Sequence, residues 1–430
     1  MIKFFLNSRL ERTLLRCISI QILIWIIFYP GLYSKDSFEI LNSVRNGLIS
    51  NTHTVQWALF VRYVSLDGAY PQFVTLISSI ILVYAVIIFT YSFFEDNLAA
   101  KVSTLVCLSP LVWGMGLTLW HDIPSTSGFL LIASLFNKRV HENNFLKAAT
   151  KYNLVLGSIL ITFRPNGLPT ILLAFVFFQI FYRSRKYLKI LAFSLGFSLL
   201  TVLFTALIFD SIPPINKVKS QEWMVNDISC YLSKHDDKFF VEKNLDNIGT
   251  IERWASIHAC DFLNSAGITK TKTFERFEFI PSAWFSLLKN EPIFILKTHL
   301  YRNSYLLPIP IDGLPNPPFI HSNIEPNNIG ITHKFALVSD FARNLIRAYN
   351  YFNEILAWVG LWILIIAYVL ILQANSKSFT LFLSLSLSFI LLIFAPIPDA
   401  RYALFTLIAG QILLLGFLLN RPKSRISIQT

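Results

Sequence analysis

Seven ionisable side chains stand at the ends of different apolar segments of this sequence, where they could do chemistry together. They are Asp36, His53, His121, Asp122, Arg164, Asp399 and Arg401. A carboxylate or a histidine can exchange a proton with a reacting group, and an arginine can hold an anion through two parallel hydrogen bonds. The set therefore combines the groups needed for proton transfer with groups that bind a phosphate or a carboxylate.

Each of these residues also has a purely structural interpretation. Asp36 could be a solvated loop carboxylate or a helix N-cap, and Asp122 stands two residues before Pro124 at a helix start, where Asp is a good cap and Pro is tolerated. Arg164 could flank a turn, and Asp399 could cap the last helix. The two histidines are more typical of interface residues than of metal ligands. The sequence leaves both interpretations open for each residue.

The composition fixes the class of protein. Of 430 residues, 54% are apolar and 14% are charged, with a mean hydropathy of +0.54. An ordinary globular protein has about 25% charged residues. A disordered chain, a small disulfide scaffold and a coiled coil are excluded, because no water-soluble fold could cover this much apolar surface. The sequence predicts an all-α polytopic membrane protein.

Ten apolar segments are candidates for helices that cross about 30 Å of hydrocarbon. Two of them, 123–137 and 147–163, are short and could instead form a re-entrant hairpin, which would leave the orientation of later segments unchanged. The ten segments are 17–34, 68–94, 102–120, 123–137, 147–163, 165–182, 190–209, 355–376, 378–398 and 402–420. The first follows a basic stretch without a cleavage site and predicts an uncleaved signal anchor.

The lysines and arginines of the short connections indicate the orientation, because basic flanks resist translocation. One side of the predicted membrane collects 17 of them and the other only five. Both termini are therefore expected in the cytoplasm and all seven candidate residues at the outer face. The chain divides into a membrane domain with seven spans (1–210), an extracytoplasmic, mainly helical domain (211–350) and a membrane domain with three spans (351–430). The net charge of +12 then comes from basic residues in the cytoplasmic loops, which set the membrane orientation. It does not indicate that the protein binds nucleic acid.

The external segments carry weaker patterns. Residues 34–67 predict two amphipathic helices that lie on the membrane surface, and apolar periodicity predicts helices at 220–233, 250–264, 280–289 and 292–306. The proline-rich stretch 306–330 could form a lid. Cys230 and Cys260 both fall in the exported domain, where they could form a disulfide or remain two buried thiols. Cys17 and Cys107 fall in spans and are expected to be packing residues.

Five short motifs, in order along most of the chain, carry a resemblance to a known superfamily. They are Tyr29-Pro-Gly-Leu-Tyr-Ser-Lys-Asp-Ser-Phe, Trp120-His-Asp-Ile-Pro, Arg164-Pro-Asn-Gly, Ala283-Trp-Phe-Ser-Leu-Leu-Lys-Asn-Glu-Pro-Ile-Phe-Ile-Leu-Lys and Asp399-Ala-Arg-Tyr. With them the chain resembles the GT-C membrane glycosyltransferases, which include protein mannosyltransferases and aminoarabinose transferases. These enzymes use a polyprenyl-phosphate sugar at the outer face of the membrane.

The resemblance implies a role for each candidate residue. Asp36 would accept the proton of the acceptor hydroxyl, and Arg164 and Arg401 would hold the lipid phosphate. Asp122 would be a second catalytic residue, which with His121 would orient the acceptor or bind a divalent ion. His53 would lie close to the donor, and Asp399 would bind substrate. The transfer would be direct and inverting. The partners implied are a polyprenyl-phosphate sugar, a glycan or lipid-linked acceptor and the bilayer, in a bacterial inner membrane.

The chain departs from the family at two places. It has Thr52-His-Thr54 where relatives often carry His-His-Pro, and His121-Asp122 where they carry a Lys-Asp pair. Because of these departures, the family's donor contacts cannot be carried over directly, and neither can its metal site. Asp122 and His121 are the candidate ligands for a divalent cation such as Mg²⁺ or Mn²⁺. The role implied for Asp36 is unaffected by the departures.

Three other functions compete with a transferase. A transporter or flippase predicts ionisable residues near the bilayer centre and broken helices in matching halves, and neither pattern is visible in the sequence. An O-antigen polymerase or ligase also handles polyprenyl-linked glycans, but such enzymes place large external loops later and rely on basic residues. A non-enzymatic assembly protein is the third alternative.

Overall fold

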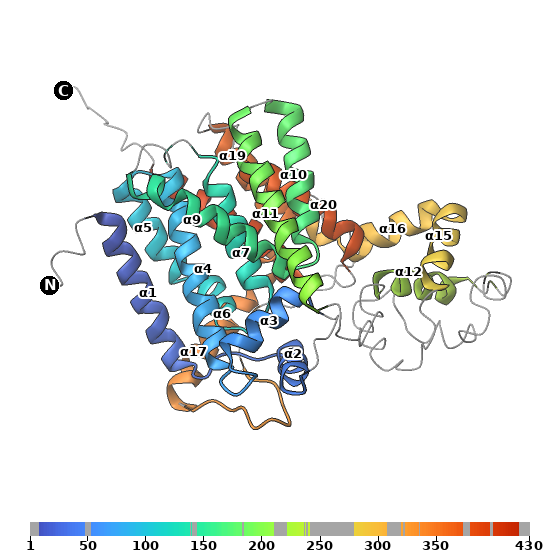
Figure 1. Ribbon diagram of the computed structural model, residues 1–430, viewed down its shortest axis with the longest axis horizontal. Coiled ribbons are helices and arrows are strands. Elements are labelled where there is room, and N and C mark those ends of the chain that lie inside the picture. The colour runs from blue at the N-terminus through green and yellow to red at the C-terminus, as the bar shows by residue number, and fades with distance from the viewer. Residues whose placement is uncertain are drawn as a thin grey trace, which may run out of the picture.

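The structure is a computed structural model, and every regular element that it describes is a helix (Figure 1). It describes residues 8–47, 53–137, 139, 144–182, 185–209, 222–235, 237, 240, 279–307, 320, 323–334, 336–372, 379–395 and 399–420. Within these ranges the isolated β-bridge is a single parallel pair between Leu32 and Thr118. The all-α prediction is confirmed for this part of the chain.

A helix occupies each of the ten predicted spans. The helices are α1 (Arg9–Ile27), α4 (Gln72–Phe93), α5 (Asp96–Cys107), α6 (Pro110–Gly116), α7 (Asp122–Ser134), α9 (Asn144–Leu160), α10 (Gly167–Tyr182), α11 (Arg185–Phe209), α19 (Val359–Leu372), α20 (Phe379–Phe394) and α21 (Leu404–Leu419). Three segments, Gln72–Phe93, Tyr187–Thr205 and Ala400–Leu419, are long and apolar enough to cross a membrane, and α5 with α6 makes a fourth if the bent pair is one span. The count of ten spans stays a prediction.

The bend between α5 and α6 has a cause in the sequence. The two helices meet at an angle of 59°. Pro110 is the first residue of α6, and its ring disfavours a helical conformation at the preceding Ser109, which caps α6 instead. The proline therefore ends α5 and restarts the chain in a new direction.

The two helices predicted in the first external segment are present as α2 (Lys35–Arg45) and α3 (Val55–Val64). The apolar side chains of α2 are not turned outward. Ile40, Leu41 and Val44 are at most 3% exposed, because other parts of the protein cover them. This amphipathic face therefore stabilises the protein core.

Three helices of the predicted exported domain, α12 (Glu222–Lys234), α15 (Phe279–Asn290) and α16 (Pro292–Arg302), form a small unit beside the bundle, here called the α12–α16 unit (Figure 1). They agree with three of the four predicted helices, and 250–264 lies outside the described residues. Two further helices, α17 (Ala336–Tyr351) and α18 (Asn353–Leu356), precede α19. The unit has its own apolar core, built around Ile228, Ile280 and Leu287.

Glycines allow two helices of the bundle to touch. The backbone of α7 approaches α9 at Gly128, where a Cβ atom would lie 2.8 Å from the Gly157 carbonyl oxygen and 2.9 Å from the Ile161 amide nitrogen. Both atoms belong to the backbone and cannot rotate away. The α7–α9 contact therefore requires glycine at position 128.

We expect Gly128→Ala to lower the stability by about 1–3 kcal/mol through overpacking. Gly196→Ala is the matched control, because nothing lies within 4 Å of a Cβ atom added to this exposed glycine of α11. The control should be neutral or stabilising by at most about 1 kcal/mol, since alanine favours a helix. Thermal unfolding of the purified protein in detergent measures both changes. Equal melting temperatures for the two variants would contradict the proposed contact.

Candidate functional site

A short backbone pairing places the first external segment against the loop that precedes α7. The Leu32 amide donates to the Leu117 carbonyl at 2.9 Å, and the Leu119 amide donates to the Leu32 carbonyl at 3.2 Å. Gly31, with φ of +125°, makes the turn after α1 that permits this approach. Asp36 and Asp122, which are 86 residues apart, each follow this pairing by a few residues.

Two side-chain contacts fix the start of α2 at this place. The Ser37 hydroxyl donates to the Leu119 carbonyl at 3.0 Å, and the Trp120 indole N–H donates to the Ser34 hydroxyl at 2.7 Å. Ser34 and Ser37 also form a capping box at the N-terminus of α2. Asp36 lies between these two serines, so its position is set by contacts on both sides.

Arg401 is the centre of the site. Its Nη2 atom lies 2.8 Å from a carboxylate oxygen of Asp36, and its Nε atom lies 2.6 Å from Asp399 and 3.9 Å from Asp122. The ring of Trp120 covers the guanidinium at 4.4 Å. Three carboxylates from three distant segments therefore surround a single, largely buried arginine.

Arg164 extends the cluster on the other side of Asp122. Its Nη1 atom lies 2.7 Å from the Asp122 carboxylate and donates to the Tyr402 carbonyl at 3.1 Å. The guanidinium also lies 4.5 Å from the centre of the Tyr402 ring. The hydroxyl of Thr54, at the start of α3, holds the backbone just before Arg164 through the Phe163 carbonyl at 2.7 Å.

The three carboxylates differ in exposure. The side chain of Asp122 is 0% exposed and that of Asp399 is 6% exposed, whereas that of Asp36 is 39% exposed. Within the cluster, Asp36 is therefore the carboxylate that a molecule arriving from outside can reach. Asp122 and Asp399 act on such a molecule only through the arginines that they hold.

The two predicted histidines join the same cluster. The rings of His53 and His121 meet edge to face at 5.2 Å, and Trp57 packs against His121 at 6.5 Å. Burial and the positive charge of Arg164 lower the pKa of His121 well below its ordinary value, so this imidazole is neutral at pH 7. All seven residues predicted from the sequence thus lie together.

The residues present do not fit a divalent cation. Each of the three carboxylates already faces a guanidinium group, which a metal ion would have to displace. In the described part of the chain no group of three or more His, Cys, Asp or Glu side chains is arranged to hold a metal ion. Asp122 and His121 are adjacent, but Asp122 faces two arginines. We derive no chemical step through a metal.

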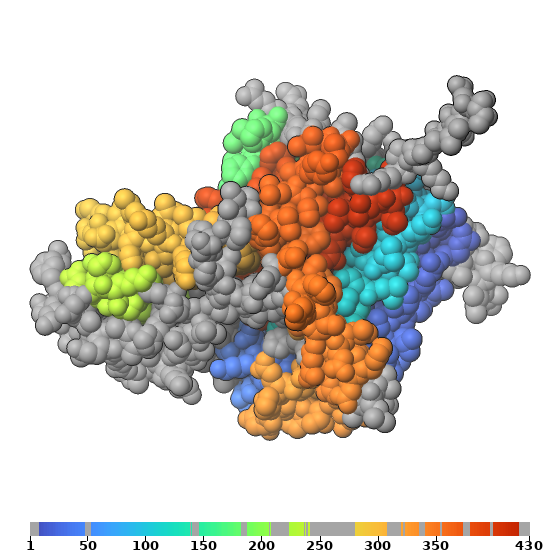
Figure 2. Space-filling view, turned by 180° about the vertical axis from the view of Figure 1, so that it is seen from behind, coloured from blue at the N-terminus to red at the C-terminus, as the bar shows by residue number. Residues whose placement is uncertain are grey.

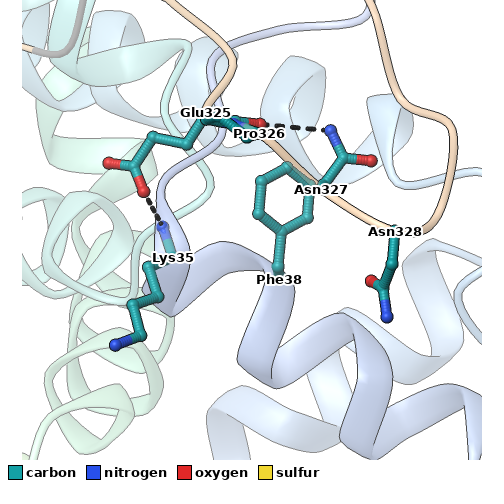
Figure 3. Close-up of a pocket in the computed structure, with 6 residues that line it drawn as sticks. All are labelled: Lys35, Phe38, Glu325, Pro326, Asn327 and Asn328. Atoms are coloured by element: carbon teal, nitrogen blue, oxygen red, sulfur yellow. Dashed lines mark hydrogen bonds between the residues drawn. The ribbon is translucent and has the colours of Figure 1, made fainter.

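A pocket of about 590 Å³ opens beside the cluster, between the start of α2 and the segment 323–334. Figure 3 shows the ring of Phe38 between Lys35 and Asn328, with Glu325 above Lys35 and Asn327 next to the ring. The segment is fixed along the first external loop, because the Glu325 amide donates to the Tyr33 carbonyl at 2.9 Å and the Lys35 amide donates to the Glu325 carboxylate at 2.8 Å. Of the predicted lid 306–330, residues 308–319 lie outside the described residues.

Sequence reasoning missed several contributors to the site. Tyr305, whose hydroxyl donates to the Asp399 carbonyl at 3.3 Å, and Glu325 were not selected. Trp120 and Tyr402 stand in the motifs, but the sequence analysis gives them no role. The signal that could have found these two is their position next to the ionisable residues His121 and Arg401.

A second buried cluster lies in the α12–α16 unit and was not predicted. Asp227 of α12 is 0% exposed and receives hydrogen bonds from Trp284 at 2.8 Å and Arg302 at 3.0 Å, and it meets His299 at 2.7 Å. Burial raises the pKa of Asp227, but the Arg302 charge and the His299 contact outweigh it and hold the pKa below its ordinary value. His299 also meets the Leu392 carbonyl of α20 at 3.0 Å, which joins the unit to the bundle.

The cysteine predictions have different outcomes. Cys17 and Cys107 are buried and free, as expected for packing residues. Cys230 is buried in α12, with its sulfur 3.9 Å from the Thr298 hydroxyl. Cys260 lies outside the described residues, so its pairing with Cys230 stays a prediction.

Comparison with known proteins gives no match. No family model matches the sequence, and no curated protein and no solved structure matches the chain.

We expect Asp122→Asn to destabilise the protein by about 3–5 kcal/mol, because the buried Arg164 loses the charge that compensates it. Asp67→Asn is the matched control. Asp67 pairs with Arg62 at 2.8 Å on the surface, and asparagine tolerates the positive φ of 56° at this position. Loss of this surface pair should lower the free energy of unfolding by at most about 1 kcal/mol. The measurement is the melting temperature of each variant in detergent. Similar melting temperatures for the two variants would show that the buried pair contributes no more stability than a surface pair.

Proposed function

We propose that this protein is an integral membrane glycosyltransferase that moves a sugar from a polyprenyl-phosphate donor to a glycan or lipid acceptor at the outer face of the membrane. The observation that carries the proposal is the meeting of Asp36, Asp122 and Asp399 around Arg164 and Arg401 at one end of an apolar helical bundle. It supplies a reachable carboxylate and two fixed cations where a membrane-bound phosphate would arrive.

The chemical step is a direct displacement at the anomeric carbon of the donor. The acceptor oxygen forms its bond to this carbon as the bond from the carbon to the phosphate oxygen breaks, so the configuration inverts. Asp36 takes the proton of the acceptor hydroxyl, a role that contributes about 10²- to 10⁴-fold in rate. Polyprenyl phosphate leaves with the bonding electrons and with increased negative charge.

The arginines stabilise the leaving phosphate. Arg401 uses its Nε and Nη2 atoms for the carboxylates, and its Nη1 group carries further N–H donors. Charge-assisted hydrogen bonds from guanidinium to phosphate are strong and directional. The buried Asp122 and Asp399 are positioning residues here, because they hold both guanidinium groups in place before the donor binds. His121, neutral and in contact with His53, lies where it can orient the acceptor.

The pocket between α2 and the segment 323–334 suits the acceptor. Its exposed polar groups are the ammonium of Lys35 and the amide of Asn328, and the largely buried ring of Phe38 forms an apolar wall. Ammonium and amide groups hydrogen-bond to sugar hydroxyls. Lys35 directly precedes Asp36, so an acceptor in this pocket lies next to the proposed base.

The proposal includes the placement of the protein. The chain would cross a bacterial inner membrane ten times, with both termini in the cytoplasm and the site outside. The apolar bundle beside the site would receive the polyprenyl chain. The start of α1 and the end of α21 line one pocket at the end of the bundle away from Asp36, which agrees with an even number of spans.

We expect Asp36→Asn to abolish transfer and to leave the protein folded, because the pair with Arg401 is partly exposed and the side chain keeps its size. The measurement is mass spectrometry of surface glycans from a strain that lacks the gene and is complemented with wild type or with the variant at matched expression. Wild type alone should restore one missing sugar mass, and that mass names the donor.

Asp67→Asn, in the same external segment but in a separate ion pair, is the matched control and should restore the glycan fully. Full restoration by Asp36→Asn would remove Asp36 from the role of base. A change in glycan chain length without a missing sugar would overturn the transferase proposal itself.

A further inference from the structure

A second pocket, of about 630 Å³, lies between α1, α5 and the C-terminal end of α21. One face of α1 and one face of α5 line most of it. The face of α1 carries Arg9, Arg12 and Arg16 at a spacing of three and four residues, and the face of α5 carries Lys101. Figure 1 shows α1 and α5 side by side at the end of the bundle where both termini lie.

The charge in this pocket is uncompensated. All four basic residues are exposed, and none of them forms an ion pair within the described part of the chain. The neighbouring carboxylates are engaged elsewhere, because Glu11 accepts from the Ser8 amide at 2.9 Å and Asp96 lies 3.5 Å from Arg139. Four cations around one concavity repel one another and favour an anion between them.

The pocket lies at one end of a candidate membrane span. The segment Ala400–Leu419 is long and apolar enough to cross a membrane, and Leu419 at its end lines the pocket. α1 runs from the pocket at Arg9 toward α2, which carries Asp36, and α21 returns from the turn that carries Arg401 to the pocket at Leu419. The pocket and the carboxylate–arginine cluster therefore stand at opposite ends of the same helices.

The apolar side chains at the rim of the pocket indicate that its ligand has an apolar part as well as an anionic group. Leu105 of α5 and Leu419 of α21 both line it and are each 47% exposed. Figure 2 shows the helices that carry them, α5 in cyan and α21 in red, next to α1 in blue. A free anion needs only the cations, whereas a phospholipid also covers apolar side chains with its acyl chains.

The geometry points to a binding site for the phosphate head group of an anionic phospholipid of the cytoplasmic leaflet. The phosphate lies between the α1 arginines and Lys101, and the acyl chains run over Leu105 and Leu419 toward the hydrocarbon region. Basic pockets between membrane helices on this side bind acidic head groups, and each basic residue adds to the affinity. This site is separate from the proposed catalytic cluster, and its assignment to the cytoplasmic leaflet rests on the orientation included in the proposed function.

The test is native mass spectrometry of the full-length, delipidated protein in detergent, titrated with phosphatidylglycerol, phosphatidylcholine or inorganic phosphate. We expect wild type to bind phosphatidylglycerol at least about tenfold more tightly than phosphatidylcholine, because only the first carries net charge. Arg9→Gln, Arg12→Gln and Arg16→Gln combined should remove this preference. Lys101→Gln alone should weaken it while leaving the α1 charges, which set the orientation of the chain, unchanged.

The matched control combines Lys147→Gln, Lys151→Gln and Lys189→Gln, which remove three exposed cations from α9 and α11 outside the pocket. This variant should bind phosphatidylglycerol as wild type does, and melting temperatures check that all variants are folded. The proposed site would be wrong if wild type bound the two lipids equally. It would also be wrong if the control and the α1 variant lost the same amount of affinity for phosphatidylglycerol. Competition by inorganic phosphate at the same concentration as the lipid would show a free-anion site instead.

Discussion

The burial of charge governs the arrangement of this chain. An arginine that leaves water loses several kcal/mol of solvation, and the loss is tolerable only if carboxylates and hydrogen-bond acceptors replace the water. Arg401 is buried with Asp36, Asp122 and Asp399 around it, and Arg164 is buried against Asp122. These residues come from four regions of the sequence, so their pairing requires the first external loop, the start of α7, the turn after α9 and the start of α21 to meet at one place.

The same requirement recurs in the α12–α16 unit. Asp227 has no exposure, and its partners come from α15 and α16, which hold it through Trp284, His299 and Arg302. His299 uses its second ring nitrogen on the Leu392 carbonyl of α20. Because α20 precedes the segment that carries Asp399, this contact places the α12–α16 unit on the helix next to the site. A second buried charge thus fixes how the unit meets the bundle.

The helices between the two ends of the bundle connect two electrostatic environments. At one end, three carboxylates balance two arginines in a largely buried cluster with one exposed carboxylate. At the other end, four exposed cations surround a pocket without a carboxylate partner in the residues described. α1 and α21 reach from one end to the other, and the segment Ala400–Leu419, which contains α21, is long and apolar enough to cross a membrane. The two ends therefore differ in how charge is compensated: the first pairs it within the protein, and the second does not pair it with any described carboxylate.

The sequence by itself determined the helical class, the positions of the apolar helices and the identity of the seven clustered residues, because long charge-free segments and isolated ionisable residues at their ends are local patterns. It could not determine that Asp122 is fully buried while Asp36 is exposed, that α2 turns its apolar face into the protein, or that segment 323–334 lies along Tyr33 and Lys35. Exposure and pairing depend on which segments pack together, and contacts between residues hundreds of positions apart leave no periodicity to read. The tertiary structure alone decided which carboxylate of the cluster is exposed.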